Sequence, residues 1–556
     1  MSYLLSKAIA NLTVRERAVF AAATALFAIS GLFAAWGTYY AATEEVPASG
    51  GSYAEGIVGQ PTFVNPLTAS GNEADYDLME LVFSDLGSLA ESSAESKDDK
   101  VWTVTLKKGL AWDDGKDLTA DDVVFTVETI QDINAYSLQS GAWQGIIAEK
   151  ISDTEIRFTL KDPYAFFPGI WKALKVTPEH IFSGIPAANL RLSEYNLEPV
   201  GNGPYSWKGM SAEKDGFIRE VSLAANPRYH GTKALMPSFT LRFYRTRQEL
   251  IGDFNAKKID GAGGILPEEE AKLAIGHRLA SFYLPRYYAL FFNQSTNPAL
   301  KEKAVRQALV RVIDRKEIVH GAFLGFAAAA LGPVPQTATG YDEEAYAENG
   351  TASPEAIRAS LDAAGWLMNP EDGVRYKGEG ASRTALRFDV VTPDIPFLKA
   401  TMDIVAKEWK TIGVEAKIAV TDPEEITRTA LRTRNYQIIL YGNVLKGDPD
   451  LFAFWHSSRK FYPGLNLALY DNKEADTLLE SVRKGGESRA DQDAALAKIQ
   501  RMVADDAPAA FLMSPAYLYA IPTGLKGMAE APLVSPSDRL LGAESWYVKT
   551  KRVLKK

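Results

Sequence analysis

An uncharged apolar run of 22 residues, Val19 to Tyr40, is the feature that most limits what this chain can be. As a helix at about 1.5 Å per residue it would be roughly 33 Å long, about the thickness of a bilayer's hydrocarbon core. Basic residues precede the run and acidic residues follow it: Lys7, Arg15 and Arg17 before, Glu44 and Glu45 after. This bias predicts a cytoplasmic N-terminus over 1–17, a transmembrane anchor over 18–42, and an extracytoplasmic body on a single-pass cell-membrane protein.

A cleaved signal peptide is the alternative interpretation of this run. Its apolar core usually has about 7–15 residues and ends in small residues, a role that Ala41 and Ala42 could fill. The length of the run favours a retained anchor, and so do Trp36, Tyr39 and Tyr40, which lie where an outer aromatic belt is expected. Residues 43–51 have linker composition, and we expect them to let the body move above the membrane.

The body is large and contains no cysteine. The 556 residues are 46% hydrophobic and 24% charged, which is typical of a globular protein with more than one domain. The net charge of −9 lacks a dominant basic block, so nucleic acid is not expected as a partner. Without cysteine there is no disulfide, thiolate metal site or lipid-carrying cysteine, and any membrane tether must be protein.

Strand-like and helix-like segments alternate beyond residue 52, which predicts a mixed α/β body. Residues 101–106 and 156–160 alternate apolar with polar side chains, as half-buried strands do. Thr119 and Asp122 form a capping-box pattern ahead of a helix. Further helices are predicted near 305–313, 398–412 and 496–503, and further strands near 414–420, 436–441 and 517–521.

Motifs of enzymes and metal sites are missing from the sequence. There is no Gly-x-Ser-x-Gly nucleophile elbow and no His-Glu-x-x-His zinc helix. The five histidines are scattered: His180, His230, His277, His320 and His456. No spacing singles out a catalytic pair among the carboxylates. We therefore expect no catalytic residue, no metal and no cofactor.

Eight short segments carry a family resemblance by their order and spacing. They are QPTFVNPL (60–67), VWTVTLKKGLAWDDGKDLTADDVVFTVE (101–128), ISDTEIRFTLKDPYAFF (151–167), PVGNGPYSW (199–207), NPRYHG (226–231), KAVRQALVRVIDRKEIVHGAF (303–323), GDPDLFAFW (447–455) and MVADDAPAAFLM (502–513). With them the chain resembles the family 5 extracellular solute-binding proteins, which include oligopeptide-, dipeptide- and nickel-binding receptors of ABC importers. The resemblance runs from about residue 52 to about residue 519.

The resemblance implies a two-lobed, periplasmic-binding-protein-like α/β fold with a hinge and an interlobe cleft. Lobe I is expected at 52–280 plus 505–556, with an insert subdomain at about 84–185, and lobe II at 281–504. Such a protein is not an enzyme. It closes around a peptide or other oligomeric small solute and, as a monomer, delivers it to an ABC permease and ATPase complex.

The loop after the strand at 436–441 matches the segment that lines the ligand cleft in this family. The candidate ligand-binding residues are therefore Tyr441, Asn443, Asp448 and Trp455. Tyrosine and tryptophan rings offer flat apolar walls with a polar edge, and asparagine offers a hydrogen-bonding side chain. Core packing is the alternative for Tyr441 and Trp455, and a turn is the alternative for Asp448.

One departure from the family narrows the ligand. Many peptide-binding members have an aspartate three residues before the Asp-Pro pair, where it meets the ligand's α-ammonium, whereas this chain has Leu445. Without a carboxylate there, a short zwitterionic peptide is disfavoured, unless Asp448 takes the role. Longer peptides, modified peptides and sugars remain open, as do an anchored surface hydrolase or a non-transport sensor on the same scaffold. The basic tail after residue 548 is expected to be solvated, with contact to anionic lipid as the alternative.

Overall fold

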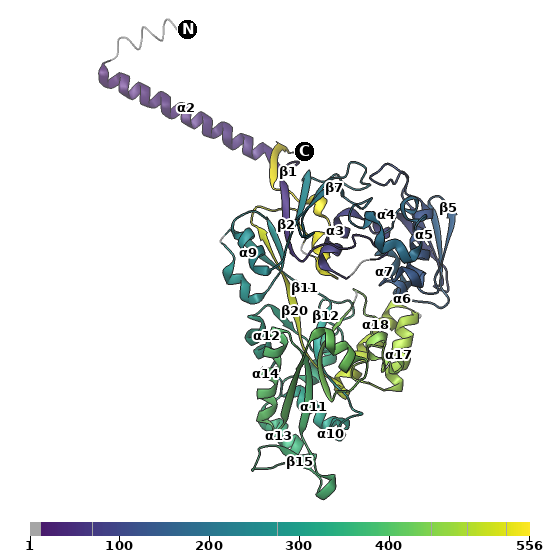
Figure 1. Cartoon of the computed structure of the whole chain (residues 1–556). Helices are drawn as coiled ribbons and strands as arrows, with labels where there is room; N and C mark the ends of the chain where they lie inside the picture. Colours follow the sequence, from purple (N-terminus) through teal and green to yellow (C-terminus); the bar gives the residue numbers. More distant parts are fainter. Residues whose placement is uncertain are drawn as a thin grey trace.

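The computed structural model describes residues 13–68, 71–274, 276–445, 447–485, 488–529 and 531–555. Two lobes lie one above the other, and a single helix projects from the upper lobe (Figure 1). Residues 1–12 of the predicted cytoplasmic N-terminus, and Lys556 of the basic tail, lie outside the described residues. The predicted two-lobed α/β fold is confirmed.

A sheet of twelve strands, counted over the described residues, runs through both lobes. Its order is β18-β17-β19-β12-β20-β10-β2-β9-β8-β7, and β11 and β13 also pair with β20. The lobe I strands are β2 (Ser52–Val58), β7 (Tyr205–Ala212), β8 (Ile218–Ala225), β9 (Ser238–Tyr244), β10 (Gly261–Ile265) and β11 (His277–Tyr283). The lobe II strands are β12 (Arg286–Phe292), β13 (Ala327–Ala329), β17 (Arg387–Pro393), β18 (Glu415–Thr421) and β19 (Ile438–Val444).

Strand β20 (Ala509–Pro522) belongs to both lobes. Residues 509–515 pair with β12 and β13, whereas residues 516–522 pair with β10 and β11. The chain crosses a second time between β11 and β12, and the Ser514 hydroxyl donates to the Leu284 carbonyl between these crossings (3.4 Å). The predicted strand near 517–521 does return to the first lobe, but the expected boundary at 504/505 precedes β20, whose first half lies in lobe II.

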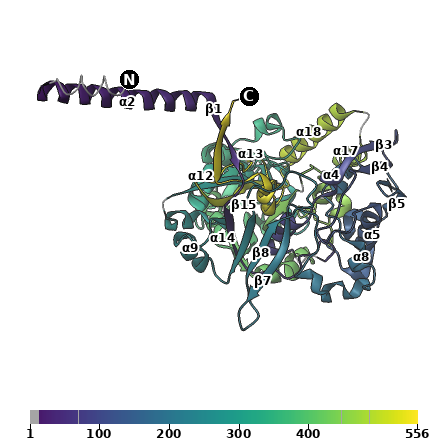
Figure 2. The ribbon, with the colours of Figure 1, turned by 90° about the horizontal axis from the view of Figure 1, so that it is seen from above.

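Lobe I carries a separate antiparallel sheet within the region predicted as the insert subdomain. Its strands are β3 (Ala90–Glu95), β4 (Val101–Leu106), β6 (Glu155–Thr159) and β5 (Ile147–Ser152). The predicted capping box is confirmed, since Thr119 and Asp122 close the start of α5 (Ala120–Gln131). Figure 2 shows this unit beside strands β7 and β8. Its other helices are α4 (Leu86–Leu89), α6 (Ser140–Trp143), α7 (Phe167–Lys172) and α8 (Glu179–Phe182), and the rest of lobe I adds α3 (Glu73–Val82) and α9 (Arg247–Asn255).

Helices cover both faces of the lobe II sheet, as the alternating pattern predicts. One face packs against α11 (Lys303–Arg311), α12 (Arg315–Phe323), α13 (Pro354–Ala363) and α14 (Pro396–Thr411). The other packs against α16 (Phe452–Trp455), α17 (Lys473–Lys484) and α18 (Arg489–Asp506). Ile418 and Val420 alternate as expected, yet they are exposed because β18 is the edge strand. The remaining elements are α10 (Pro298–Lys301), α15 (Pro423–Ile426) and a small sheet of β14 (Leu367–Met368), β15 (Arg375–Lys377) and β16 (Thr384–Ala385).

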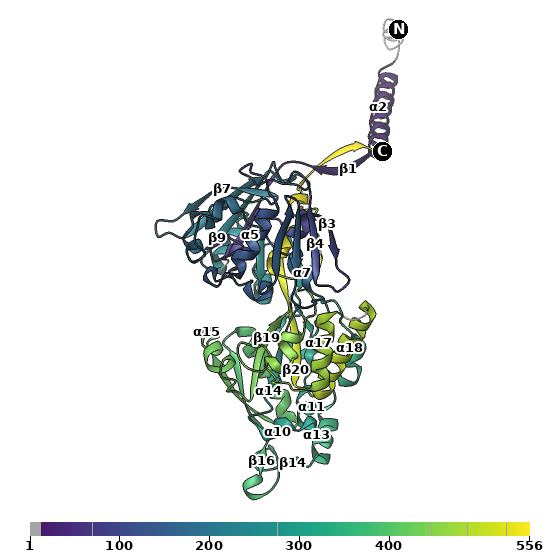
Figure 3. The ribbon, with the colours of Figure 1, turned by 90° about the vertical axis from the view of Figure 1, so that its right-hand side faces the viewer.

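The apolar run forms α2 (Val14–Ala42), none of whose residues is buried. Among the described residues, this is the one helix long and apolar enough to cross a membrane. The segment predicted as a linker instead forms β1 (Thr43–Ala48), which pairs antiparallel with β21 (Lys549–Leu554) (Figure 3). The expected linker is corrected to a strand, and the tail, whose lysines are exposed as expected, is paired with it, because each strand supplies the other with backbone hydrogen-bond partners that composition cannot reveal.

Candidate ligand site between the lobes

The end of β19 lies at the hinge edge of lobe II. Val444 pairs with Arg286, the first residue of β12, and the Leu445 N–H donates to the Pro285 carbonyl (2.7 Å). Tyr441 and Asn443 are two residues apart on this strand, so their side chains share one face. The predicted strand therefore delivers both candidates to the edge of lobe II that faces lobe I.

Asn443 and Tyr441 have different surroundings on that face. The Asn443 amide is buried and donates to the Tyr287 hydroxyl (2.9 Å). Tyr441 is half-buried against the hydrophobic cluster of lobe II that contains Tyr287, and burial raises the pKa of the Tyr441 hydroxyl. Tyr441 is therefore the more accessible of the two side chains, while Asn443 is fixed by its partner.

Trp455 lies behind this edge, inside lobe II. Its side chain is 0% exposed and packs near the rings of Phe511 (5.7 Å between centroids) and Tyr470 (6.0 Å). Trp455 is therefore a core residue in this arrangement, as the alternative interpretation of the sequence expects. Its ring packs in the cluster behind the strand that carries Tyr441.

Asp448 faces the insert subdomain across the gap between the lobes. Its carboxylate lies so close to Gly169 of α7 that a Cβ at Gly169 would collide with it. Burial raises the pKa of Asp448, and Arg489 and Lys172 oppose that rise. Only a glycine at 169 leaves room for this carboxylate, so the two lobes fit together at this point.

Asp450 makes a second interlobe contact that sequence reasoning did not identify. Its carboxylate accepts a hydrogen bond from the Tyr164 hydroxyl (2.8 Å) and lies 3.3 Å from Arg483 Nε. The Ala165 N–H donates to the Arg483 carbonyl (3.0 Å). Burial, and then the Asp450 carboxylate, raise the pKa of Tyr164. The segments 151–167 and 447–455 were both recognised as motifs, but nothing in either sequence shows that they touch.

A cavity of about 170 Å³ lies beside the hinge on the lobe II side. Its walls include Tyr283 and Ser514 at the two crossings and the segment after β13, with Gln336 and Thr337. Among the described residues the buried Thr337 hydroxyl has no hydrogen-bond partner. A Cβ on Gly340 would lie 3.7 Å from Pro449, so this wall adjoins the loop that carries Asp448. The segment that lines the cavity therefore continues, at Gly340, into contact distance of the loop that carries Asp448.

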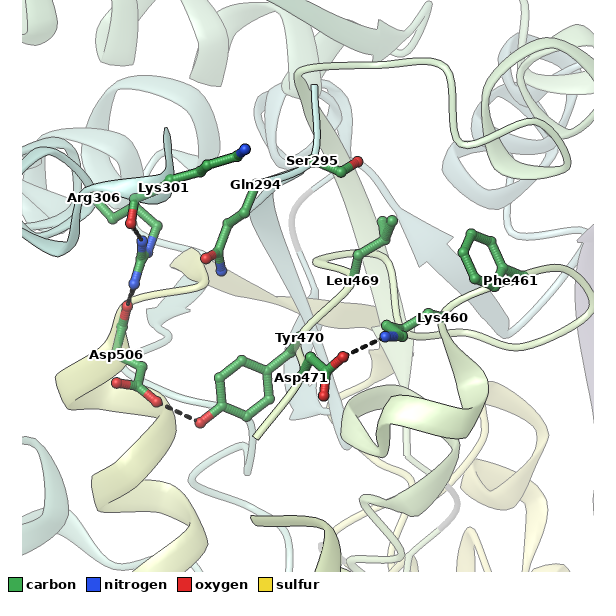
Figure 4. A pocket seen from close by; sticks show the side chains of 10 residues that line it. All are labelled: Gln294, Ser295, Lys301, Arg306, Lys460, Phe461, Leu469, Tyr470, Asp471 and Asp506. Carbon is green, nitrogen blue, oxygen red and sulfur yellow. Dashed lines mark hydrogen bonds and ion pairs between the residues drawn. The ribbon is translucent and has the colours of Figure 1, made fainter. Parts of the chain in front are cut away.

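A larger cavity, about 690 Å³, lies elsewhere (Figure 4). It opens after the far end of β12, away from the hinge, and near the end of α18. Its polar groups bind one another: Lys460 pairs with Asp471 (2.5 Å), and the Tyr470 hydroxyl donates to Asp506 (2.6 Å). The interlobe region is the better candidate site, because it joins two bodies that a ligand could draw together.

Within the described ranges, no group of three or more His, Asp or Glu side chains is arranged to hold a metal ion. The interlobe region instead offers aromatic rings, an amide, hydroxyls and half-buried carboxylates. These groups can form hydrogen bonds and stack against a solute, and a hinge lets them approach it from both sides.

Comparison with known proteins agrees with this geometry. The family model of the bacterial extracellular solute-binding proteins, family 5 Middle, matches residues 86–462. The oligopeptide-binding protein AppA of Bacillus subtilis is 27% identical over 525 residues, covering 90% of this chain and 92% of that protein. The structure of that protein with a nonapeptide has a TM-score of 0.69 at 25% identity and covers 92% of this chain and 100% of its own.

A second solved structure resembles the chain more closely in shape. The ABC transporter substrate binding protein CtaP of Listeria monocytogenes has a TM-score of 0.76 at 25% identity, covering 90% of this chain and 100% of its own. The resemblance inferred from eight short segments is confirmed, because the family model spans more than half of the residues. The chain belongs to the family 5 bacterial extracellular solute-binding proteins.

Proposed function

We propose that this chain is the membrane-anchored substrate-binding protein of an ABC importer, and that it captures a peptide-like solute by lobe closure. The observation that carries the proposal is the contact of Tyr164 in lobe I with Asp450 in lobe II, across a hinge of two crossing segments. A solute that touches both lobes only when they approach favours the closed form by its differential affinity. The relatives named as peptide-binding and as ABC transporter proteins support the ligand class and the partner.

The proposed ligand surface is the hinge edge of lobe II. Tyr441 provides an aromatic wall, Asn443 fixes the strand that carries it, and Asp448 supplies a half-buried carboxylate for an N–H or ammonium group of the solute. Trp455 supports this edge from behind. The cavity beside Thr337, about 170 Å³, has the volume of roughly one side chain of the solute. Leu445 is buried and offers no charge, so a carboxylate for an α-ammonium has to come from Asp448.

We further propose that α2 is a retained anchor. Its 29 residues, at about 1.5 Å each, exceed the roughly 30 Å of a hydrocarbon core, and Trp36, Tyr39 and Tyr40 lie exposed near its outer end. Alkaline carbonate extraction of membranes tests this: an anchored chain stays in the pellet at its full mass. A cleaved chain would be released and lack its first residues by mass spectrometry.

The binding proposal is tested with the full chain in lipid nanodiscs and peptides of graded length. A bound solute raises the midpoint of thermal unfolding by mass action, and small-angle scattering reports closure. Asp448→Asn should weaken the rise, whereas the matched control Asp471→Asn, in the far cavity, should not. Mass spectrometry of the recovered solute separates the alternatives, since a hydrolase returns it cleaved. If no peptide moves the midpoint or the scattering profile, the proposal is wrong.

A further inference from the structure

The C-terminal strand β21 meets the chain at the outer end of α2, where β1 begins. The last carbonyls of a helix have no partner within the helix. Here most of the hydrogen bonds that these carbonyls accept come from the C-terminal segment. Thr43 Oγ1 donates to the Tyr39 carbonyl (2.6 Å), Arg552 Nη2 to the Tyr40 carbonyl (3.2 Å) and the Lys555 N–H to the Ala42 carbonyl (2.9 Å). The positive Arg552 also suits the negative end of the helix dipole.

The level of this junction follows from the aromatic rings of α2. Trp36, Tyr39 and Tyr40 are about half exposed, and such rings settle at the headgroup level of a bilayer. The Arg552 guanidinium lies 4.1 Å from the Tyr40 ring centre. The end of β21 is therefore held at the same level as the aromatic rings. The ribbon of β1 and β21 runs sideways from this point toward lobe I (Figure 3).

The two faces of this ribbon differ in charge. Because side chains alternate, Lys549 and Lys551 share one face, and Lys555, four residues beyond Lys551, continues the same alternation past the end of β21. The first two lie opposite Ala48 and Val46. All three lysines are exposed, and none forms an ion pair within the part of the chain that the structure describes.

On the other face of the ribbon, the positive charge of Arg552 is paired. Arg552 lies 3.7 Å from the Glu45 carboxylate and donates to both the hydroxyl and the carbonyl of Thr43 (2.9 Å each). The ribbon's excess positive charge therefore lies on the lysine face, which also carries Val46, Val553 and one carboxylate, Glu44. A basic face with apolar side chains between the charges, fixed at headgroup level, has the composition that anionic bilayers attract.

We propose that this lysine face of the β1–β21 ribbon binds anionic lipid headgroups, and that β21 thereby fixes the body's position over the membrane. The inference rests on the proposed anchor, because α2 sets the level of the ribbon. Each lysine near an anionic surface strengthens the contact by roughly fivefold at moderate ionic strength.

The chain has no cysteine, so one introduced cysteine can be labelled without background. Thr550→Cys places a dye on the opposite face of the ribbon, and energy transfer to headgroup-labelled lipid reports its distance from the membrane. The full chain is reconstituted in vesicles of phosphatidylcholine, with and without phosphatidylglycerol. We expect stronger transfer with phosphatidylglycerol, and loss of the increase as salt shortens the Debye length from about 10 Å to about 3 Å.

The variant K549Q/K551Q/K555Q should remove the increase and bring transfer to the level of neutral vesicles. The control K214Q/K407Q/K417Q makes the same change of charge at exposed lysines elsewhere and should keep it. Transfer that is independent of lipid charge in every variant overturns the proposal, as does transfer between labelled copies, which would show that the ribbon pairs with a second chain. Carbonate extraction and the peptide-dependent midpoint are read in the same samples, so failure of the anchor or of peptide binding is seen separately.

Discussion

Two charged clusters, one inside lobe I and one where the lobes meet, are built from the same residue types but differ in burial. In lobe I, Arg539 lies 2.9 Å from Glu55 and 2.8 Å from Asp77, and all three side chains are 0% exposed. On the face of lobe II that meets lobe I, Asp450 and Arg483 are 3.3 Å apart, with side chains 20% and 37% exposed, and Asp450 accepts a hydrogen bond from Tyr164 of lobe I. The first cluster joins the segment after β20 to β2 and α3, whereas the second contacts the other lobe through the hydrogen bond from Tyr164 to Asp450.

The difference in burial separates a structural role from a conformational one. A buried charge that loses its partner cannot recover water, so the lobe I cluster holds a single arrangement. Asp450 is partly exposed, so it can exchange the Tyr164 hydroxyl for water at little cost, and the interlobe contact can form and break. Closure requires contacts of the second kind.

Arg539→Met should have the largest effect, because it leaves Glu55 and Asp77 buried without a cation. We expect the free energy of unfolding to fall by about 5 kcal/mol, the upper end for a broken buried pair. Urea denaturation measures it. The control Arg245→Met removes a surface arginine that pairs with Glu213 and Asp215, and should cost at most about 1 kcal/mol. Equal losses for the two variants would contradict the comparison.

Trp455→Ala tests whether the hinge edge of lobe II is supported from behind. Because the ring is 0% exposed, we expect a loss of about 4 kcal/mol in the free energy of unfolding. Tyr441→Ala, at a half-buried ring, should cost less and should weaken the peptide-dependent rise in the thermal midpoint. A Trp455→Ala protein with an unchanged unliganded midpoint would instead place that ring in the ligand surface.

Glu55→Gln tests the lobe I cluster through pH. Burial raises the pKa of Glu55 to about 7 despite Arg539, so the folded state favours the protonated form. The stability that protonation gives is complete below the unfolded value of 4.5 and is lost as pH rises through about 7. From about pH 5 to 8 the wild type should lose about 1–3 kcal/mol relative to the variant.

Comparing the wild type with Glu55→Gln cancels the contribution of other groups that titrate in the same pH range. Burial also raises the pKa of Glu80 and of Glu408 to about 7, and both are present in wild type and variant alike. Chemical denaturation across this range provides the curve. Parallel curves for the two proteins would show that Glu55 stays ionised in the folded state.

Tyr164→Phe should have the smallest effect on unfolding and a clear effect on closure. It removes the hydroxyl that donates to Asp450 and leaves the ring in place. We expect a change of at most about 1 kcal/mol in stability and an apparent peptide affinity weakened by up to about fivefold. Scattering of the unliganded protein should shift toward the open form. Tyr462→Phe, at a half-exposed ring away from this contact, is the control.

Local patterns predicted local structure well. The capping residues of α5, the alternation in β4 and the helix-to-strand unit of α14 and β18 depend on neighbours in the chain, and they were found where expected. The ordered motifs identified the family. Pairings between distant segments could not be predicted, because Thr43 meets Leu554 and Tyr164 meets Asp450 only through the tertiary fold. The burial of Trp455 likewise depends on α17 and α18 packing over it.

The position of β20 in the sequence also governs when, during synthesis, the protein can complete its fold. This strand is internal to the sheet in both lobes, with β12 and β13 beside its first half and β10 and β11 beside its second, yet it spans residues 509–522 of 556. Until nearly the whole polypeptide has been synthesised, the sheet of each lobe lacks this internal strand and leaves the edges of its neighbours unpaired. Neither lobe can therefore complete its main sheet until synthesis is almost finished, which favours an incompletely folded chain of the kind that a translocation channel can thread across a membrane.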